Sequence, residues 1–225
     1  MRIGVLGGTG PAGAAVAVQF AAIGIEVVVG SRSAERAAGV VRELSDRWPG
    51  RGLALVPGDN ALAAETDLVV VATPWEGALR TVADHREALG GKIVVSMVNC
   101  LTRWGNHMVP LVPPTGSVAQ AIAAELPASE VAGAFHHLPA GPWADLDKPL
   151  EADVLVCAAF RATARQVVDL VDRLPGLRGI DAGGLGSALA IEAMTATLIE
   201  VNRRYRAHAS LRLSGLDTHA PDSSR

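Results

Sequence analysis

The sequence predicts an α/β fold, a doubly wound, Rossmann-type parallel sheet with a small C-terminal helical cap. Short apolar segments typical of strands alternate along the chain with longer segments of helical pattern, which favours a mostly parallel sheet covered by helices. Several strand segments are continuous apolar runs, as expected where both faces of a sheet are buried. A glycine-rich turn also follows the first such segment, at the place where this class of fold binds nucleotides.

The expected strands and helices follow one another along almost the whole chain. The expected strands are residues 2–6, 26–30, 53–56, 67–72, 93–97, 131–135 and 154–158. The expected helices are residues 12–23, 34–48, 60–65, 75–85, 118–125, 163–174 and 187–206. A Pro-Gly-Arg-Gly segment at 49–52 ends the second helix, and a long proline-rich loop is expected after Cys100. We expect Asp67 and Asp153 to begin their strands and to have no other role.

The composition is typical of a soluble metabolic enzyme and gives no support for nucleic acid or membrane partners. Hydrophobic residues make up 49% of the 225 residues, which is enough for a sizeable core, and the net charge of −3 provides no basic field. The apolar N-terminal run is too short and too glycine-rich to span a bilayer, and it lacks the basic region of a signal peptide. Cys100 and Cys157 are isolated, so we expect reduced thiols and a cytoplasmic protein.

The first expected strand leads into Gly8-x-Gly10-x-x-Gly13, the spacing typical of a dinucleotide-binding turn. In that pattern the first glycine makes a tight turn, the second lets the backbone approach a pyrophosphate, and the third lets a helix pack closely on the strand. The phosphates lie on free N–H groups at the helix N-terminus, where Pro11 fits because the first helical position needs no N–H. Since an apolar strand precedes the turn and an apolar helix follows it, we favour a nucleotide site over a purely structural turn.

The end of the second expected strand favours NADP over NAD. NAD-binding folds place a carboxylate there to bind the ribose hydroxyls, but this strand ends in Ser31-Arg32. Arg32 and Arg36 flank the next helix, with Thr9 as a further hydroxyl donor, and a guanidinium can hold a 2′-phosphate through two charge-assisted hydrogen bonds. The alternative is that both arginines are solvated. Cations near a helix N-terminus are unfavourable, however, unless an anion is bound there.

Three loops after strand ends complete the expected site, because ligands of open α/β sheets bind beyond the carboxyl ends of the strands. They are Thr-Pro-Trp-Glu at 73–76, Val-Asn-Cys at 98–100 and Phe-His-His-Leu-Pro-Ala-Gly-Pro at 135–142. His136 and His137 point to opposite faces of an extended segment and cannot chelate one metal together, and no other cluster has metal spacing, so we expect no metal site. His136 either faces the pocket as a donor or is a buried histidine bonded to a backbone carbonyl.

Taken together, these motifs resemble one family, the NADP-dependent reductases of the deazaflavin coenzyme F420 (F420H2:NADP oxidoreductases). The resemblance extends from Met1 to about Leu216. It rests on Leu-Gly-Gly-Thr-Gly at 6–10, Val-Val-Gly-Ser-Arg at 28–32, Thr-Pro-Trp-Glu at 73–76, Lys-Ile-Val-Val-Ser at 92–96, His-His-Leu-Pro-Ala at 136–140, Asp-Ala-Gly-Gly-Leu at 181–185 and the long helix with Glu192. The N-terminal motifs are shared with many reductases, whereas the last three in this order are much more specific.

The resemblance implies direct ring-to-ring transfer of a hydride between NADP(H) and coenzyme F420. It implies no catalytic side chain, because both reacting carbons belong to the cofactors and the protein binds and orients them. The implied NADP-binding residues are Gly8, Thr9, Gly10, Pro11, Ala12, Gly13, Ser31, Arg32, Arg36, Pro74, Val98 and Ala140. The implied deazaflavin-binding residues are His136, Leu138 and Leu211.

The resemblance also implies a division of the chain. Residues 1–135 are expected to form the NADP-binding Rossmann core, residues 136–212 the deazaflavin-side segment and C-terminal helical cap, and residues 213–225 a polar tail. The long helix at 187–206 either covers the sheet or forms a dimer seam, and we expect a homodimer. Within that helix, Glu192 is expected to be an ion-pair partner rather than a base.

A few side chains have two interpretations. Arg203, Arg204 and Arg206 are candidates to contact the anionic tail of F420, or they form a solvated face near a helix C-terminus, where the helix dipole stabilises cations. Trp75 and Trp143 either form a wall of the ring pocket or pack at the boundary between loop and core.

Two other functions stay open. An NADP-dependent imine or carbonyl reductase would share the N-terminal fold but would need a proton donor, for which His136 and His137 are the candidates. A non-enzymatic NADP-sensing module would bind NADP without turnover and signal through the helix at 187–206. The cytosolic domain of membrane ferric reductases shares the resemblance, but it works with a transmembrane haem part for which this sequence has no candidate span.

Overall fold

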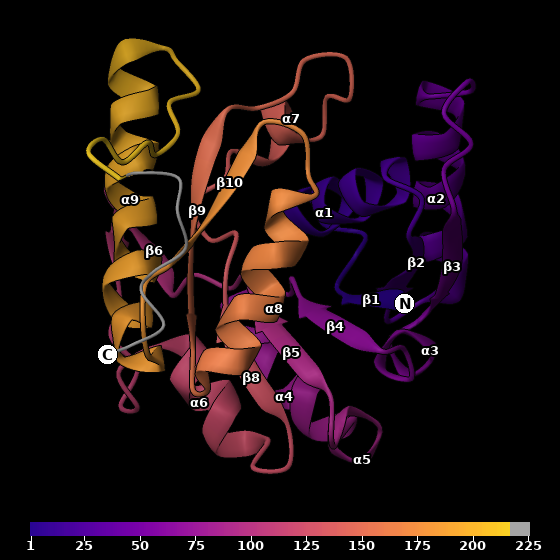
Figure 1. Cartoon of the computed structure of the whole chain (residues 1–225), viewed down its shortest axis with the longest axis horizontal. Helices are drawn as coiled ribbons and strands as arrows, with labels where there is room; N and C mark the ends of the chain where they lie inside the picture. Colours follow the sequence, from indigo (N-terminus) through magenta and orange to yellow (C-terminus); the bar gives the residue numbers. More distant parts are fainter. Residues whose placement is uncertain (217–225) are drawn as a thin grey trace.

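The computed structural model describes residues 1–216, and residues 217–225 lie outside the described part. Most of the polar tail expected at 213–225 therefore falls outside it. The described residues form an eight-stranded, mostly parallel sheet in the order β10-β9-β8-β5-β4-β1-β2-β3, with helices on both faces (Figure 1). This confirms the predicted α/β fold.

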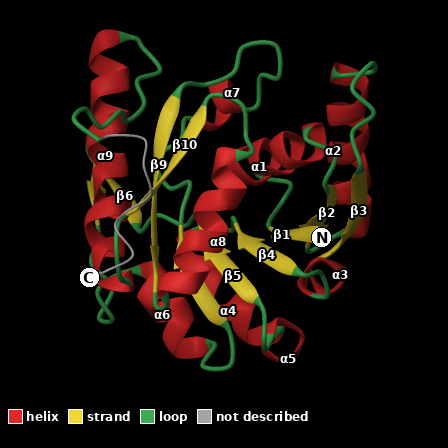
Figure 2. Cartoon of the chain, viewed as in Figure 1, coloured by secondary structure: helices red, strands yellow, loops and turns green. Residues whose placement is uncertain are grey.

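The strands and helices alternate along the chain as the sequence predicted (Figure 2). The sheet contains β1 (Arg2–Leu6), β2 (Glu26–Ser31), β3 (Leu55–Asp59), β4 (Leu68–Val71), β5 (Ile93–Ser96), β8 (Glu130–Gly133), β9 (Ala152–Ala158) and β10 (Leu177–Asp181). The helices are α1 (Pro11–Ala22), α2 (Ala34–Arg47), α3 (Asn60–Ala64), α4 (Trp75–Asp84), α5 (Arg86–Leu89), α6 (Val118–Glu125), α7 (Ala140–Trp143), α8 (Arg161–Asp172) and α9 (Ala188–Tyr205), with a 3-10 turn at Leu185–Ser187. Every expected strand and helix is present, with small shifts at the ends.

Two apolar layers enclose the sheet. On one face, α1, α7 and α8 pack on strand residues such as Ile3 and Val70. On the other face, α4, α5 and α6 pack on residues such as Val69 and Val94. Burial of both faces explains why the central strands are continuous apolar runs. Among residues 1–216, no helix has the length and apolar character needed to cross a bilayer.

The expected proline-rich loop is partly a β-hairpin, which the sequence prediction missed. Its strands β6 (Leu101–Trp104) and β7 (His107–Pro110) pair antiparallel, and Trp104 lies opposite His107. The two residues between them begin with Gly105, whose φ of 57° is in the left-handed region that two-residue hairpin loops require. The prolines expected to keep the loop irregular begin only where the hairpin ends.

The strand after β8 reverses direction. β9 pairs antiparallel with β8 through Ala132↔Ala158 and Gly133↔Cys157, and β10 then runs parallel to β9. The N-terminal halves of β9 and β10 therefore lie at the same sheet edge as the C-terminal ends of β1, β4 and β5. The sheet is thus continuous across residue 135, and α9 stands at the opposite side of the molecule from the first strands (Figure 1).

Asp153 has a larger role than beginning a strand, so that expectation is wrong. Its side chain is fully buried within β9 and accepts hydrogen bonds from Arg178 Nε at 2.9 Å and Nη2 at 2.6 Å. Burial raises the pKa of the Asp153 carboxyl, but the hydrogen bonds and charge of Arg178, the Leu213 N–H and the charge of Arg212 together hold that pKa below its ordinary value. Asp67, in contrast, is exposed at the start of β4 and accepts from the Arg2 N–H at 2.7 Å.

Candidate functional site

Loops from the six parallel strands meet at one edge of the sheet, and backbone contacts join those after β2, β1, β4 and β5. Gly8 donates to the Gly30 carbonyl at 2.8 Å, which ties the glycine turn to the end of β2. Ala72 donates to the Leu6 carbonyl and Met97 to the Val71 carbonyl, which ties the ends of β1, β4 and β5. Most of the predicted nucleotide-binding residues thus lie on one continuous row of loops at the carboxyl ends of β2, β1, β4 and β5, which we call the ledge.

The tight turn after β1 depends on Gly7, one residue earlier than the sequence pattern placed it. Gly7 has φ 77°, and a Cβ there would lie within about 3 Å of Thr73. Its N–H donates to Asn60 Oδ1 at 3.3 Å, so a side chain from α3 holds the turn. Gly8 is close to the second strand instead, because its Cβ would lie 2.9 Å from Val29 Cγ1.

The other two glycines of the pattern have different surroundings. A Cβ on Gly13 would lie 2.5 Å from the Gly7 carbonyl oxygen and 2.8 Å from Gly8 Cα, so α1 packs directly on the turn. A Cβ on Gly10 would lie 3.6 Å from its nearest neighbour, which leaves space in front of the turn. Helix α1 begins at Pro11, and no described side chain caps it. Its first N–H groups are therefore available to an anion.

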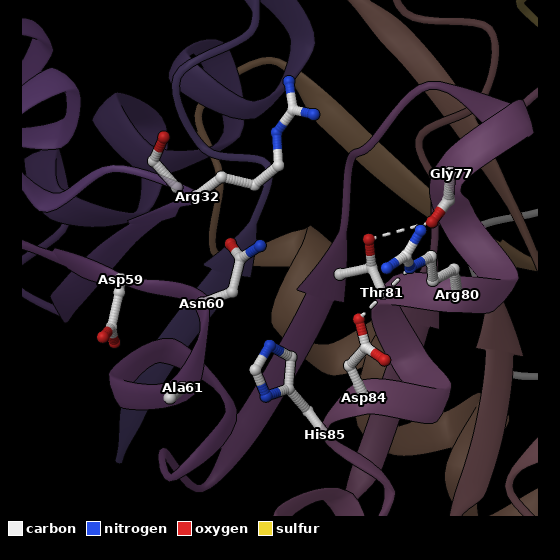
Figure 3. A pocket seen from close by; sticks show the side chains of 10 residues that line it. Arg32, Asp59, Asn60, Ala61, Gly77, Arg80, Thr81, Asp84 and His85 are labelled. Atoms are coloured by element: carbon white, nitrogen blue, oxygen red, sulfur yellow. Dashed lines mark hydrogen bonds and ion pairs between the residues drawn. The ribbon is translucent and has the colours of Figure 1, made fainter.

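A cavity of about 490 Å³ opens between the end of β2, the beginning of α3 and one side of α4. It is lined by Ser31, Arg32, Asp59, Asn60, Ala61, Gly77, Arg80, Thr81, Asp84 and His85. Ser31 connects the cavity to the turn, because Ser31 Oγ lies 3.5 Å from Thr9 Oγ1. Figure 3 shows Arg32 and Asn60 on one side and the α4 side chains with His85 on the other. The volume of the cavity is within the range of small-molecule sites, and its lining includes two arginines from different elements, Arg32 and Arg80.

The structure brings Arg32 to this cavity but leaves Arg36 outside its lining. Arg36 is exposed on the first turn of α2, where its N–H donates to the capping Ser33 hydroxyl at 3.2 Å. Arg80, which was not among the residues predicted from the sequence, lies in the cavity wall, 3.8 Å from Asp84. The spacing of Gly77, Arg80 and Asp84, three and four residues apart, does indicate that these residues share one face of a helix.

The middle of the ledge contains an unpaired hydroxyl. Thr73 Oγ1 is buried and has no hydrogen-bond partner among the described residues. It lies between the glycine turn and Pro74, which precedes the first residue of α4. Val98, from the loop after β5, is buried close by in the core cluster that also contains Leu6. A buried polar atom without a partner is costly, so this position is suited to a polar ligand group.

The loop after β8 is fixed by an aromatic stack. Phe135 has φ 65°, an uncommon backbone conformation for a bulky residue. Its ring stacks on Trp143 at 5.4 Å and meets the edge of Phe20 of α1 at 6.0 Å. Trp143 is almost fully buried, and its carbonyl accepts from Gln19. Trp143 therefore packs at the boundary between loop and core and does not form a wall of the ring pocket.

His136 points inward rather than toward the open edge. Its side chain is fully buried, and neither ring nitrogen has a hydrogen-bond partner among the described residues. Burial, followed by the charge of His137, lowers the pKa of His136 to about 3, so the ring is neutral at ordinary pH. Its backbone carbonyl accepts from Asn99 Nδ2 at 2.8 Å and Thr195 Oγ1 at 3.1 Å. The histidine that bonds a backbone carbonyl is instead His137, whose Nε2 lies 2.8 Å from the Asp153 carbonyl oxygen.

Glu192 lies beneath this loop and connects two helices. Its carboxylate accepts from the N–H groups of Val118 and Ala119, both at 3.0 Å, at the beginning of α6. Burial raises the pKa of Glu192, and the two backbone hydrogen bonds partly oppose that rise. Its Oε1 is 4.0 Å from His136 Nε2, and because His136 is neutral this contact is no ion pair. The expectation of an ion-pair partner is therefore wrong, and the carboxylate caps a helix instead.

The remaining predicted contact residues lie around the same loop. Leu138 is half-buried against the core, and Ala140 begins α7. Leu211 belongs to a half-buried segment that follows α9, and its carbonyl accepts from the Asp153 N–H at 2.8 Å. Arg203 pairs with Glu200 at 2.5 Å and donates to the Asn106 carbonyl at the tip of the β6–β7 hairpin.

Comparison with known proteins gives consistent matches along the chain. A family model described as "NADP oxidoreductase coenzyme F420-dependent" matches residues 2–100. The chain is 34% identical over 223 residues to the F420-dependent NADP reductase of Methanocaldococcus jannaschii, a match that covers 96% of this chain and 100% of that protein. It is 30% identical over 222 residues to the F420-dependent NADP reductase of Methanothermobacter marburgensis, with 96% and 99% covered. A crystal structure from Arthrobacter sp. FB24 superposes with a TM-score of 0.78 at 25% identity, covering 93% of this chain and 97% of that one.

Replacing Gly13 by Ala should destabilise the protein, because the new Cβ would lie 2.5 Å from the Gly7 carbonyl oxygen. Overpacking of this kind costs about 1–3 kcal/mol, which exceeds the roughly 0.5–1 kcal/mol that Ala gains over Gly inside a helix. Thermal unfolding followed by circular dichroism should therefore give a lower Tm than the wild type. The matched control is Gly10→Ala, whose Cβ has 3.6 Å of space and should leave the Tm of the nucleotide-free protein unchanged. An equal loss in both variants would contradict the packing argument.

Proposed function

The chain belongs to the family of coenzyme F420-dependent NADP oxidoreductases, and we propose that it transfers a hydride between NADP(H) and the deazaflavin coenzyme F420. Full-length similarity to two F420-dependent NADP reductases supports the reaction. The NADP part of the proposal rests on the ledge at the sheet edge, where an uncapped helix N-terminus adjoins a cavity lined by two arginines. That arrangement suits a nucleotide with phosphates at two positions.

The nucleotide would extend along the ledge in the order of the strands. We place the adenosine and its 2′-phosphate in the cavity of Ser31 and Arg32, with Arg36 on the neighbouring helix turn. The pyrophosphate would lie against Gly8, Thr9, Gly10, Pro11, Ala12 and Gly13. The nicotinamide would then reach Pro74, Val98 and Ala140, where the Thr73 hydroxyl needs a partner. The residues present fit the nucleotide, since Gly10 leaves open space where a side chain would otherwise obstruct the phosphates.

The deazaflavin would lie on the far end of the same ledge, between the loop after β8 and the segment after α9. Leu138 and Leu211 would supply apolar contacts, and His136 would contribute backbone groups because its ring is buried. When bound, NADP(H) and F420 supply the two carbons between which the hydride moves. The chain's own part is to hold both rings in contact and to exclude water from them. No side chain needs to act as an acid or base.

The competing imine or carbonyl reductase has less support. It needs a proton donor beside the hydride acceptor, and neither candidate histidine is suited to that role. His136 is buried with a pKa of about 3, and His137 Nε2 bonds the Asp153 carbonyl oxygen. Burial also lowers the pKa of His137. Neither ring is an available acid at ordinary pH.

The functional division of the chain follows from these placements. Residues 1–135 would hold NADP(H), and residues 136–212 would hold the deazaflavin, although one continuous sheet carries both. The two free, buried cysteines, Cys100 and Cys157, are consistent with an enzyme of the reducing cytoplasm.

We also propose that the protein is a homodimer formed through α9 and the β6–β7 hairpin. A groove of about 420 Å³ lies between them, lined by Met108, Pro110, Ala193, Met194, Ala196, Thr197 and Glu200. Trp104 is 76% exposed on the hairpin, and Tyr205 is 77% exposed at the end of α9. Exposed aromatic side chains beside an apolar groove are typical of an interface between subunits.

The reaction is tested by mixing the purified protein with NADPH and oxidised F420 and recording the visible absorbance of the deazaflavin. We expect the absorbance to fall as NADPH is consumed, with one deazaflavin reduced for each NADPH. The same protein should show no turnover with a cyclic imine or a ketone. Turnover of the imine or ketone without bleaching of F420 would overturn the proposal, and NADP binding without any turnover would favour a sensing module.

Cofactor choice is tested by replacing the arginines singly. Arg32→Ala should raise the KM for NADPH but not for NADH, since losing a charge-assisted contact to the 2′-phosphate costs about 1.5–3 kcal/mol, or about tenfold or more in affinity. Arg80→Ala should act in the same direction because Arg80 lines the cavity, and Arg36→Ala should have the smaller effect because Arg36 does not. Equal weakening of NADPH and NADH binding in Arg32→Ala would show that the 2′-phosphate lies elsewhere.

The dimer is tested by light scattering, which should give twice the chain mass of 23.2 kDa. Met194→Glu places a second carboxylate beside Glu200 in the groove and should shift the protein to the monomer. Leu79→Glu, at an exposed apolar residue of α4 that is outside the groove, is the matched control and should stay dimeric. A wild-type mass of 23.2 kDa at micromolar concentration would refute the proposal.

A further inference from the structure

The buried carboxylate of Asp153 fastens the segment that follows α9. Asp153 Oδ2 accepts from the Leu213 N–H at 2.6 Å, and the Asp153 N–H donates to the Leu211 carbonyl at 2.8 Å. Arg178, which holds the carboxylate from β10, also donates to the Leu213 carbonyl at 2.8 Å. Arg212 lies 3.5 Å from Asp153 Oδ1 and 3.2 Å from Glu151 Oε2. The segment at 209–213 is thus bound to β9 by backbone and side chain together, and we call it the C-terminal strap.

The same residue also holds the loop after β8. The carbonyl oxygen of Asp153 lies 2.8 Å from His137 Nε2, and both side chains are buried. His137 lies between His136 and Leu138, so this contact fixes the part of the loop that we propose for the deazaflavin. One residue of β9 therefore contacts both walls of the proposed site, the strap with Leu211 and the loop with Leu138.

The reversal of β9 makes this arrangement possible. β8 pairs with β9 only at Ala158 and Cys157, the last residues of β9. The first half of β9 therefore extends past the end of β8, with its hydrogen-bonding edge open on that side. The strap occupies this edge at Asp153, and Ser210 Oγ adds a bond to the Glu151 carbonyl at 2.9 Å. A parallel β9 would have placed its first residues at the other edge of the sheet.

We propose that Asp153 is a positioning residue that sets the separation of the two deazaflavin walls by holding the strap and the His137 loop on one strand. The inference rests on the proposed function, because it takes Leu138 and Leu211 as those walls. Asp153 itself is fully buried, so we expect it to act through the strap and the loop and not by touching a cofactor. Its effect should therefore be larger on the binding of F420 than on the binding of NADPH, most of whose proposed contacts lie on the loops after β1, β2, β4 and β5.

The test is Asp153→Asn in the full chain, with steady-state kinetics for each cofactor and amide hydrogen exchange. Removing the charge weakens the contacts of Arg178 and the Leu213 N–H, so the KM for F420 should rise about tenfold while the KM for NADPH stays within about twofold. The Leu213 amide should exchange faster than in the wild type. The control is Asp67→Asn, an exposed carboxylate just before β4 that accepts from the Arg2 N–H at 2.7 Å. It should leave both KM values and the Leu213 amide unchanged.

Arg212→Gln provides a milder second variant if Asp153→Asn folds poorly. Arg212 is about half exposed, and its loss should raise the KM for F420 in the same direction but less. An equal rise of both KM values, or a fall in kcat with the KM for F420 unchanged, would overturn the inference while leaving the proposed reaction intact. If the wild type does not reduce F420 at all, the proposed function fails instead. The exchange measurement needs no turnover, and a wild-type rate at Leu213 in Asp153→Asn would by itself refute the strap.

Discussion

The close approach of α1 to the turn after β1 is the contact on which the rest of the site depends. Gly13 lets the first turn of the helix lie against the backbone of Gly7 and Gly8, and Asn60 holds Gly7 from below. Were the helix held farther away, its N-terminus would no longer point along the ledge formed by the other strand ends. The space in front of Gly10 can hold a phosphate only because the close approach of α1 brings free N–H groups beside it.

Reversal of the last two strands contributes the second half of the site. Six parallel strands end at one edge of the sheet, whereas β9 and β10 begin at that edge and run in the opposite direction. Their N-terminal halves carry Asp153 and Arg178, which bind the segment after α9. The sheet thus presents strand ends on the NADP side and strand beginnings on the deazaflavin side. One continuous sheet thus supports both the NADP side and the deazaflavin side of the proposed site.

The sequence predicted those features that local pattern encodes and missed those that depend on distant contacts. Continuous valine runs and the glycine spacing were enough for the parallel strands and for the turn. β10 was missed because its Leu-Arg-Gly-Ile-Asp is neither an apolar run nor a clean alternation, as suits an edge strand. Glu192 and Asp153 were misjudged because their partners, at the N-terminus of α6 and in the segment after α9, are far away in sequence.

The aromatic contacts of Phe135 have a mechanical consequence. Phe20 belongs to α1, the helix whose opposite end faces the proposed pyrophosphate position, and its ring meets Phe135 at the base of the loop that carries Leu138. Helix α1 therefore contacts both the proposed pyrophosphate position and the base of the loop that we propose for the deazaflavin. The distance between the two redox rings would then be set by the densely packed interior, and it would not depend on the closure of a lid before the reaction.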